Sequence, residues 1–523
     1  MQLYHMDICT CKEIHGTRRT IIVILLMFIV FSPFISCSDR CAEIDSSDPF
    51  ARVRCRIEEL MDEKGIASFQ VAIARDGQII YEEAFGWANV QRRVPTTTST
   101  MHLVASIAKP FTSTALLILA EREEIGLHDP VNKYSGAGKL IAYRGDASEA
   151  TIARLLLHTT GLPYGYYIAG PEVPQENTRS DNDLIDLAGV LVSAPGTRYQ
   201  YTNIGYGLFE EIVRGVTGEN IKEFISREII APLGLTHTCF FKGAVPVDSI
   251  ATQNVDGGIL PIAYDVGGYT ALYSTAGDLA RFGMFHLKAH LADQKQIVSD
   301  SGIDLLWTYR DSAESISTRR LGWDVQQDYG FLTVQHGGGG PGIHNWLYMI
   351  PSAKVVIALM SNAQYGSSNA VLKELIAAAV SQSGKSDFQP RAGRGWPQWP
   401  VLNPVTLSGQ WVGEIKGPKG ACSVLVSFDL RGNPSIYIDG DNCGNQEWVR
   451  TSSEVKKHYG SLLWRFDACI PYLIPFAIHD EVILSIWQED GKLVGSASAA
   501  KEKNFGRGEN YVLPQFIELR RSD

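Results

Sequence analysis

The sequence has few of the features that mark a nucleic-acid-binding or metal-binding protein. Its 47 lysines and arginines are outnumbered by 57 aspartates and glutamates, which gives a net charge of −10, and no long basic run is present. Nucleic acid is therefore not an expected partner. The nine cysteines contain no Cys-x-x-Cys pair, so a zinc ribbon or a thioredoxin-like site has no support. We expect neither a metal nor a cofactor.

Two common enzyme motifs are also missing. No Gly-x-Ser-x-Gly is present, which argues against an α/β-hydrolase, and no Gly-x-x-x-x-Gly-Lys is present, which argues against a phosphate-binding loop. Residues 337–342 formally fit Gly-x-Gly-x-x-Gly. A dinucleotide site would need a helix after these glycines, and Pro341 opposes that helix. We interpret the glycines as room for the backbone to approach a substrate.

The N-terminus has the pattern of a secretion signal. Arg18 and Arg19 precede an apolar run over residues 21–35, which is shorter than the roughly 20 residues of a membrane-spanning helix. Residues 34–37 resemble a bacterial lipobox, with Cys37 as the lipidated residue. Plain cleavage nearby and an uncleaved membrane anchor are the alternatives. Each version predicts an exported protein, with its body in the periplasm or outside the cell.

The rest of the chain is long enough for two or three domains. Residues 69–86 alternate apolar and polar side chains around Asp76-Gly77, a hairpin signal, and several amphipathic stretches follow. The pattern predicts an α+β domain over residues 45–385, with helices on a mainly antiparallel sheet. The signal segment before this domain covers residues 1–40. Residues 386–404, which follow the domain, are rich in proline and glycine and predict a linker.

Residues 405–523 predict a separate C-terminal all-β domain, a barrel or a sandwich, because short strand patterns alternate with turn signals. The strand patterns cover residues 411–415, 423–430, 435–438, 482–487 and 493–498. Export permits disulfides, and our first expectation is Cys422–Cys443, although a sequence alone cannot fix the pairing.

A Ser-x-x-Lys motif, residues 106–109, opens a long apolar stretch that reaches about Glu121. Positions i and i+3 share one face of a helix, so the amine of Lys109 would reach the hydroxyl of Ser106. A partly desolvated lysine can take the proton of a serine, which is otherwise a weak nucleophile. The same spacing at 453–456 and 498–501 lies in the β-rich part, where these positions face opposite sides.

Two further short motifs follow in order, Tyr201-Thr202-Asn203 and His336-Gly337-Gly338. Taken singly, Tyr201 would be a core residue, Asn203 a helix cap and His336 a structural histidine. Taken in order, Ser-x-x-Lys, Tyr-x-Asn and a basic residue-x-Gly resemble the three motifs of serine β-lactamases and penicillin-binding proteins. Further segments of that superfamily are matched at 156–163, 195–203 and 274–280.

The resemblance covers about residues 50–380 and implies a β-lactamase-like fold and a serine hydrolase that forms an acyl-enzyme. Ser106 would attack a carbonyl carbon, Lys109 would assist its deprotonation, and Tyr201 would act as general base or pass the proton to the leaving group. Backbone N–H groups of Ser106 and Gly339 would form an oxyanion hole. The substrate-binding residues implied are Asn203, His336, Gly338 and Gly339.

The third motif departs from the frequent Lys-Thr-Gly of the superfamily. A lysine holds a permanent charge that can anchor a carboxylate, whereas His336 would be mostly neutral near pH 7. Penicillin hydrolysis is therefore less favoured than hydrolysis of esters, amides or D-amino-acid peptides. By pattern, the chain is close to β-lactamase-like esterases, D-aminopeptidases and D-alanyl-D-alanine carboxypeptidases. The alternative is a catalytically silent sensor of penicillin or cell-wall ligands; the oligomeric state is not predicted.

Overall fold

The computed structural model describes most of the chain beyond the expected signal segment. The described residues are 41, 44, 47–134, 136, 138–169, 181–240, 246–255, 258–260, 272–311, 318–363, 369–381, 403–418, 420–439, 449–450, 456–458, 461–466, 481–501 and 509–522. The expected signal segment and nearly all of the expected linker lie outside these residues. Among the described helices, none is both long and apolar enough to cross a membrane.

A seven-stranded antiparallel sheet forms the centre of the α+β body. Its order is β12-β13-β14-β15-β1-β2-β3. The expected hairpin is confirmed, because Asp76 and Gly77 adopt positive φ values of 48° and 80° between β1 and β2. The strands are β1 Ser68–Arg75, β2 Gln78–Asn89, β3 Val94–Pro95, β12 Asp324–Asp328, β13 Phe331–Gly340, β14 Ile343–Ile350 and β15 Val355–Ser361.

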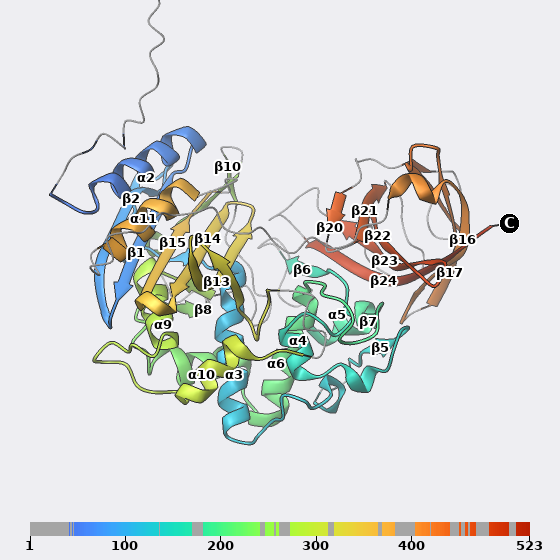
Figure 1. The fold of residues 1–523 in the computed structure, drawn as a ribbon, viewed down its shortest axis with the longest axis horizontal. Coiled ribbons are helices and arrows are strands. Elements are labelled where there is room, and N and C mark those ends of the chain that lie inside the picture. Colours follow the sequence, from blue (N-terminus) through green and yellow to red (C-terminus); the bar gives the residue numbers. More distant parts are fainter. Residues whose placement is uncertain are drawn as a thin grey trace, which may run out of the picture.

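Helices cover both faces of this sheet. α2 (Ala51–Lys64) and α11 (Asn369–Ser381) pack on one face, and α9 (Ala276–His286) packs on the other (Figure 1). Every residue of β15 is buried, as expected for a strand covered on both sides. The sequence therefore correctly predicts helices on an antiparallel sheet.

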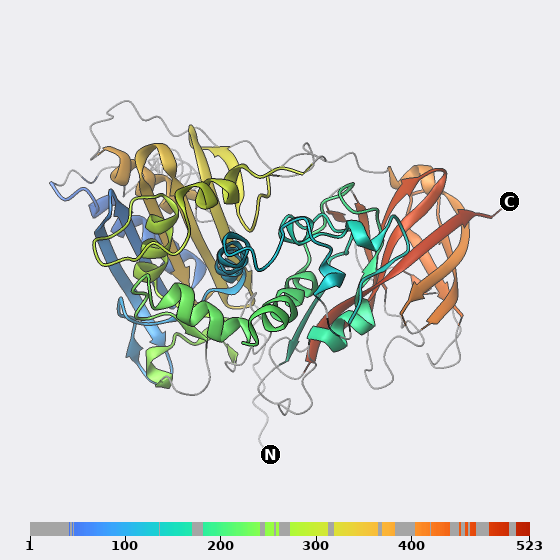
Figure 2. The ribbon, with the colours of Figure 1, turned by 90° about the horizontal axis from the view of Figure 1, so that it is seen from below.

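The helix after Ser106, α3 (Ala108–Glu121), lies at the centre of the molecule. Nearly all its side chains are buried, including its polar ones, because other helices and the sheet surround it. Figure 2 shows α3 end-on, between the sheet and the remaining helices. Those helices are α4 Ile152–Leu156, α5 Asp181–Ala188, α6 Asn203–Thr217, α7 Ile221–Ile225 and α10 Asp300–Thr308.

The C-terminal strands form one curled antiparallel sheet, in the order β19-β18-β17-β16-β24-β23-β22-β21-β20. The predicted all-β domain is thus present as a half-barrel. Its strands are β16 Gly409–Gly417, β17 Gly420–Phe428, β18 Pro434–Ile438, β19 Val449–Arg450, β20 Lys456–His458, β21 Ser461–Phe466, β22 Glu481–Glu489, β23 Lys492–Lys501 and β24 Glu509–Arg521.

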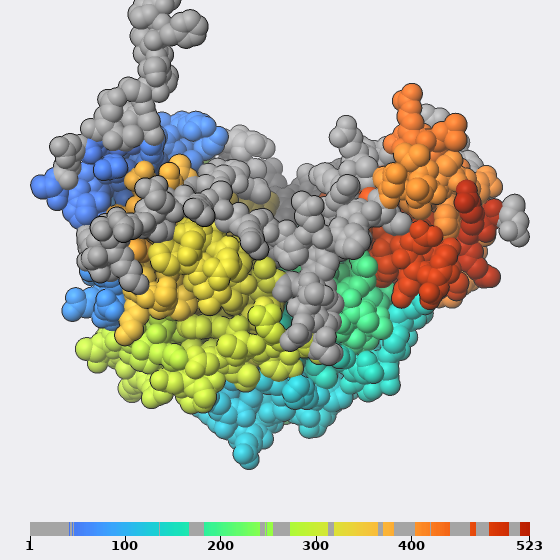
Figure 3. All heavy atoms as spheres, viewed as in Figure 1, coloured from blue at the N-terminus to red at the C-terminus, as the bar shows by residue number. Residues whose placement is uncertain are grey.

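One strand of the α+β body joins this C-terminal sheet. β6 (Tyr166–Ala169) pairs antiparallel with the first residues of β24. Side chains reinforce the junction: Tyr143 stacks on Phe516 at 5.1 Å, and Arg198 lies 4.2 Å over the ring of Trp487. In Figure 3 the C-terminal sheet stands as a second lobe, which the helical part joins to the first.

The remaining described strands are short and form three small separate sheets. They are β4 His102–Leu103, β5 Ile141–Ala142, β7 Val190–Leu191, β8 Cys239–Phe240, β9 Gln253–Val255, β10 Gly258–Leu260 and β11 Leu272–Ser274.

The expected disulfide Cys422–Cys443 is wrong. Cys422 is a free, buried thiol on β17, and burial raises its pKa to about 11. Cys443 lies outside the described residues. The described disulfide joins Cys41 to Cys55 and ties the chain before α2 to that helix. The pairing partner of Cys55 could not be read from spacing, because a disulfide depends on which residues the fold brings together.

Candidate active site

Ser106 lies in a single tight turn, residues Ala105–Ile107, that leads directly into α3. Ala105 has a φ of 51°, a conformation that costs energy for a residue with a Cβ. Its neighbours in the turn are buried, but Ser106 is only half-buried, so its hydroxyl lies at the surface of the body. Pro110 falls in the first turn of α3, where proline is tolerated.

Lys109 is fully buried beneath Ser106. Its Nζ lies 3.3 Å from Ser106 Oγ and donates a hydrogen bond to Asn203 Oδ1 at 2.7 Å. The rings of Tyr201 and Tyr206 lie 4.8 and 5.3 Å from the same nitrogen. Burial, together with a second positive charge nearby, holds the pKa of Lys109 well below its usual value. Burial therefore favours the neutral amine, which carries a lone pair that can accept a proton.

The hydroxyl of Tyr201 donates a hydrogen bond to Ser106 Oγ at 2.8 Å. Tyr201 lies in the extended segment before α6, and the Thr202 side chain caps that helix. The backbone N–H of Thr202 donates to Nδ1 of His158 at 3.1 Å, and the ring of His158 packs against Tyr201 at 4.4 Å. His158 therefore supports Tyr201 within the segment before α6.

The third motif lies on β13, which passes close to the Ser106 turn. A Cβ placed on Gly338 would lie 2.0 Å from the carbonyl oxygen of Val104, so only glycine fits there. Gly339 is exposed, and a Cβ on it would meet nothing within 4 Å. The strand continues as a hairpin into β14, and no helix follows these glycines. The interpretation against a dinucleotide site is confirmed.

His336 is buried on β13 and uncharged. Its Nδ1 donates to the carbonyl oxygen of Gly337 at 2.7 Å, which leaves Nε2 as an acceptor without a hydrogen-bond partner among the described residues. Burial lowers the pKa of His336 well below its usual value, and the positive charges of Arg319 and Lys109 lower it further. The third motif therefore offers no permanent positive charge.

A family model described as Beta-lactamase matches residues 53–381, which is more than half of the chain. This chain is a member of the beta-lactamase family. It belongs to the superfamily of serine β-lactamases and penicillin-binding proteins, whose members are serine hydrolases.

Curated relatives of this beta-lactamase-family chain are distant. "Protein flp" of Staphylococcus aureus (strain COL) is 27% identical over 195 residues, which cover 37% of this chain and 39% of flp. The chain therefore spans well under half the length of that relative.

Solved structures of the superfamily share the fold. The octameric penicillin-binding protein homologue from Pyrococcus abyssi aligns with a TM-score of 0.54 at 20% identity, over 90% of this chain and 99% of its own. A class C beta-lactamase aligns with a TM-score of 0.53 at 19% identity, over 66% of this chain and 99% of its own.

In this member of the beta-lactamase family, hydrogen bonds join four of the predicted residues: Ser106, Lys109, Tyr201 and Asn203. His336 interacts electrostatically with Lys109. Gly338 lies against Val104, just before the turn that carries Ser106. The structure records no direct contact between Gly339 and Ser106. Of the competing Ser-x-x-Lys spacings, Ser498–Lys501 lies on β23 and is unrelated to the site, and Ser453 lies outside the described residues.

The motifs in the sequence did not identify one charged residue of the site, Arg319. Arg319 is buried just before β12, in an ion pair with Asp324 at 3.2 Å, and its guanidinium lies 5.5 Å from the ring centroid of Tyr201. No short motif marks it. A signal was present in the pair Arg319-Arg320 next to the apolar Leu321 and Trp323, since two adjacent arginines in a buried segment need acidic or aromatic partners.

Proposed function

We propose that this chain is an exported serine hydrolase that cleaves ester, amide or D-amino-acid peptide substrates through an acyl-enzyme on Ser106. The observation that carries the proposal is the position of one hydroxyl. Ser106 Oγ lies between the buried amine of Lys109, at 3.3 Å, and the phenol of Tyr201, at 2.8 Å. A nucleophile in hydrogen-bond contact with a base, which a third group orients, is the arrangement that activates serine.

Acylation begins when neutral Lys109 takes the proton of Ser106 while Oγ attacks the substrate carbonyl carbon. Asn203 accepts a hydrogen bond from the same amine and so aims its lone pair at the serine. The negative charge on the carbonyl oxygen is held by backbone N–H groups of Ser106 and Gly339. The bond to the leaving group then breaks, and the hydroxyl of Tyr201 supplies the proton that the leaving group takes.

Deacylation reverses these proton transfers with water as the nucleophile. The phenolate of Tyr201 takes a proton from water, and the hydroxide attacks the ester carbonyl carbon. The bond to Ser106 Oγ breaks, and Oγ recovers the proton that Lys109 holds. The enzyme returns to its starting state, and one water molecule has been added across the substrate bond.

The lack of charge at the third motif bears on which substrates the site would bind. His336 carries no charge near pH 7, so this position does not supply the cation that would hold a penicillin carboxylate. Small esters, amides and D-amino-acid peptides are therefore the favoured substrates. Export is supported by the N-terminal pattern and by the disulfide Cys41–Cys55, since disulfides persist in oxidising compartments. The same N-terminus would serve as the membrane anchor if it is not cleaved.

A fluorescent phosphonate tests the proposal, because it reacts with an activated serine and stays attached. We expect the wild-type protein to be labelled on Ser106, as located by peptide mass spectrometry, and Ser106→Ala to remain unlabelled. Ser113→Ala is the matched control, since it removes a buried hydroxyl from the same helix and should leave labelling intact. A wild-type protein that never labels would instead be the silent sensor.

The substrate class follows from a second measurement. A panel of chromogenic esters, D-alanyl peptides and a cephalosporin is offered to the wild-type protein, with Ser106→Ala as background. Turnover of the esters or peptides supports the proposed class. Turnover of the cephalosporin alone would contradict the argument from His336.

A further inference from the structure

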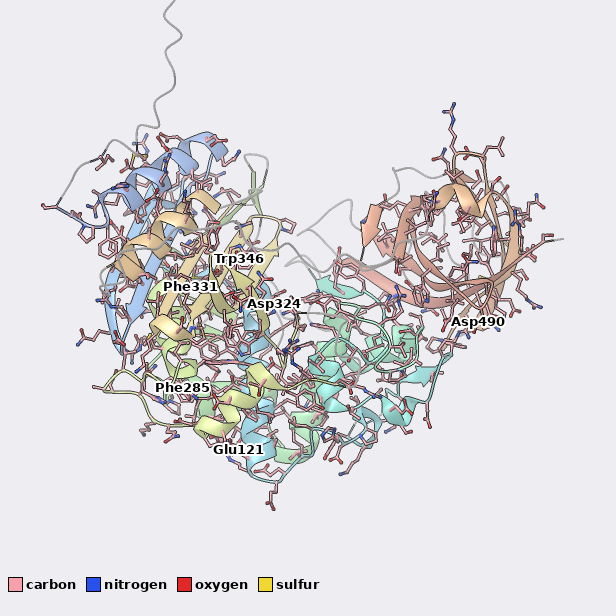
Figure 4. All side chains as sticks on the ribbon, in the orientation of Figure 1. Glu121, Phe285, Asp324, Phe331, Trp346 and Asp490 are labelled. Atoms are coloured by element: carbon pink, nitrogen blue, oxygen red, sulfur yellow. A yellow bond between two sulfur atoms is a disulfide. The ribbon has the colours of Figure 1, made fainter. Side chains whose placement is uncertain are left out.

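A buried arginine lies against the reacting tyrosine. The guanidinium carbon of Arg319 is 5.5 Å from the ring centroid of Tyr201, within the roughly 6 Å at which a cation is attracted by a ring face. Arg319 pairs with Asp324 both through backbone bridging and through an ion pair at 3.2 Å, with side chains 5% and 8% exposed. Asp324 lies in the middle of the body (Figure 4).

We propose that Arg319 is a positioning residue: it supplies a permanent positive charge that lies, like the amine of Lys109, against the ring of Tyr201, and it stabilises the phenolate that forms when Tyr201 gives its proton to the leaving group. The inference rests on the proposed hydrolase function. It assigns to Arg319 the charge that the third motif lacks at His336.

The effect on Lys109 is a repulsion between two buried cations. After burial itself, Arg319 is the group that lowers the pKa of Lys109. Because few water molecules screen a buried pair, the repulsion between them is stronger than at the surface. Arg319 therefore favours the neutral amine that the proposed acylation step needs.

The effect on Tyr201 is an attraction. Burial alone would lower the pKa of Arg319, but the negative charges of Asp324 and of ionised Tyr199, Tyr201 and Tyr206 raise it instead; among these tyrosines, Tyr201 is the one in contact with Ser106. Coupling between two sites is reciprocal. The guanidinium therefore favours the phenolate that forms when Tyr201 gives its proton to the leaving group.

Other groups around the guanidinium do not supply this charge. Burial, with the positive charges of Arg319 and Lys109, lowers the pKa values of His158 and His336 well below their usual range, so both rings are neutral. Asp324 is already paired with Arg319. The titratable and charged groups that face the site from the surrounding elements are Lys109, His158, Tyr199, Tyr201, Tyr206, Arg320, Asp324 and His336.

The test is the pH dependence of phosphonate acylation of Ser106 in the full chain, from about pH 5 to about pH 10. Removal of the guanidinium removes the repulsion that favours neutral Lys109, and Lys109 must be neutral to take the proton of Ser106. We expect R319Q to shift the ascending limb of the profile by about one pH unit to higher pH, which slows acylation about tenfold at pH values below the limb. R319K keeps the charge and should keep the limb near its wild-type position.

Two further variants distinguish the effect of the Arg319 charge on the pH profile from an effect on the stability of the fold. R319Q leaves Asp324 buried without its cation, which can destabilise the protein, so R319Q/D324N removes both charges and should show the same shifted limb. R281Q is the matched control, because Arg281 is a largely buried arginine whose guanidinium pairs with Asp293 and the carbonyl oxygen of Leu233 rather than with Asp324; its limb should not move.

An unmoved limb in R319Q/D324N, at full or at reduced rate, would show that Arg319 is only structural and would overturn the inference. That result differs from failure of the proposed function, in which the wild-type protein itself is not acylated.

Discussion

Replacement of Tyr201 by phenylalanine isolates the contribution of one hydroxyl group. The change removes the hydrogen bond to Ser106 Oγ but keeps the ring that packs against His158 and lies beside Lys109. Loss of a positioned proton donor or base typically slows the chemical step by about 100- to 10,000-fold. At about 1.36 kcal/mol for each factor of ten, this is about 2.7–5.4 kcal/mol of barrier height.

The same substitution should hardly change stability. Tyr201 is half-buried, and a hydrogen bond of this kind contributes only about 0.5–1.5 kcal/mol net to folding. The assay is the acylation rate with a chromogenic ester or a phosphonate, measured beside the thermal unfolding midpoint. We expect a large loss of acylation with a nearly unchanged midpoint.

Tyr206→Phe is the matched control. It removes a phenol hydroxyl five residues further along the chain, and this hydroxyl donates to the carbonyl oxygen of Leu156 at 3.0 Å rather than to Ser106. Because Tyr206 is fully buried, loss of its bond should cost about 1–3 kcal/mol of stability while acylation continues. Tyr201→Phe should therefore lose acylation and keep its stability, whereas Tyr206→Phe should lose stability and keep acylation. A Tyr201→Phe protein that acylates within threefold of wild type, roughly 0.65 kcal/mol, would refute the role given to this phenol.

Three further predictions concern other parts of the body. Gly338→Ala should abolish phosphonate labelling, because its Cβ would press on Val104, whereas Gly339→Ala has free space and should still label; equal labelling would contradict this. Lys109→Met should slow acylation at least 100-fold without lowering the unfolding midpoint, since a buried amine is replaced by an apolar chain of similar length; retained activity would exclude Lys109 as base. Burial lowers the pKa of His102 to about 4 from 6.5, so its contribution to stability is complete above pH 6.5 and is lost as the pH falls toward 4. In urea unfolding, His102→Gln should remove about 2 kcal/mol of the stability lost between pH 7.5 and 5, and an unchanged loss would contradict the buried neutral histidine.

The sequence predicts those parts of the fold whose cause is local. The Asp76-Gly77 turn requires positive φ values, which these residues adopt easily, and the hairpin follows. The helix at Asn203–Thr217 ends at Gly218, as its left-handed conformation indicates. Ser106 and Lys109 lie three positions apart in one chain segment, so a single helical turn is enough to bring them together.

What the sequence does not predict depends on contacts between distant segments. Arg319 meets Tyr201 because the fold brings the residues before the edge strand β12 against the segment before α6, and no spacing in the sequence encodes that contact. The pairing of β6 with β24 joins segments more than 300 residues apart. The sequence of β6 has no strand pattern strong enough to predict this pairing. The Cys41–Cys55 bridge spans only 14 residues, but its pairing depends on how the chain before α2 folds back on that helix.

The pairing of β6 with β24 makes the last described strand part of the support for the proposed active site. β6 follows Gly165, whose carbonyl oxygen accepts hydrogen bonds from the backbone N–H groups of Asn203 and Ile204 at 3.0 and 3.2 Å. Melting of the half-barrel would open the edge of β6 and loosen the start of α6. We therefore expect the two lobes to unfold together, so that calorimetry records a single transition in which loss of labelling and loss of the C-terminal sheet coincide.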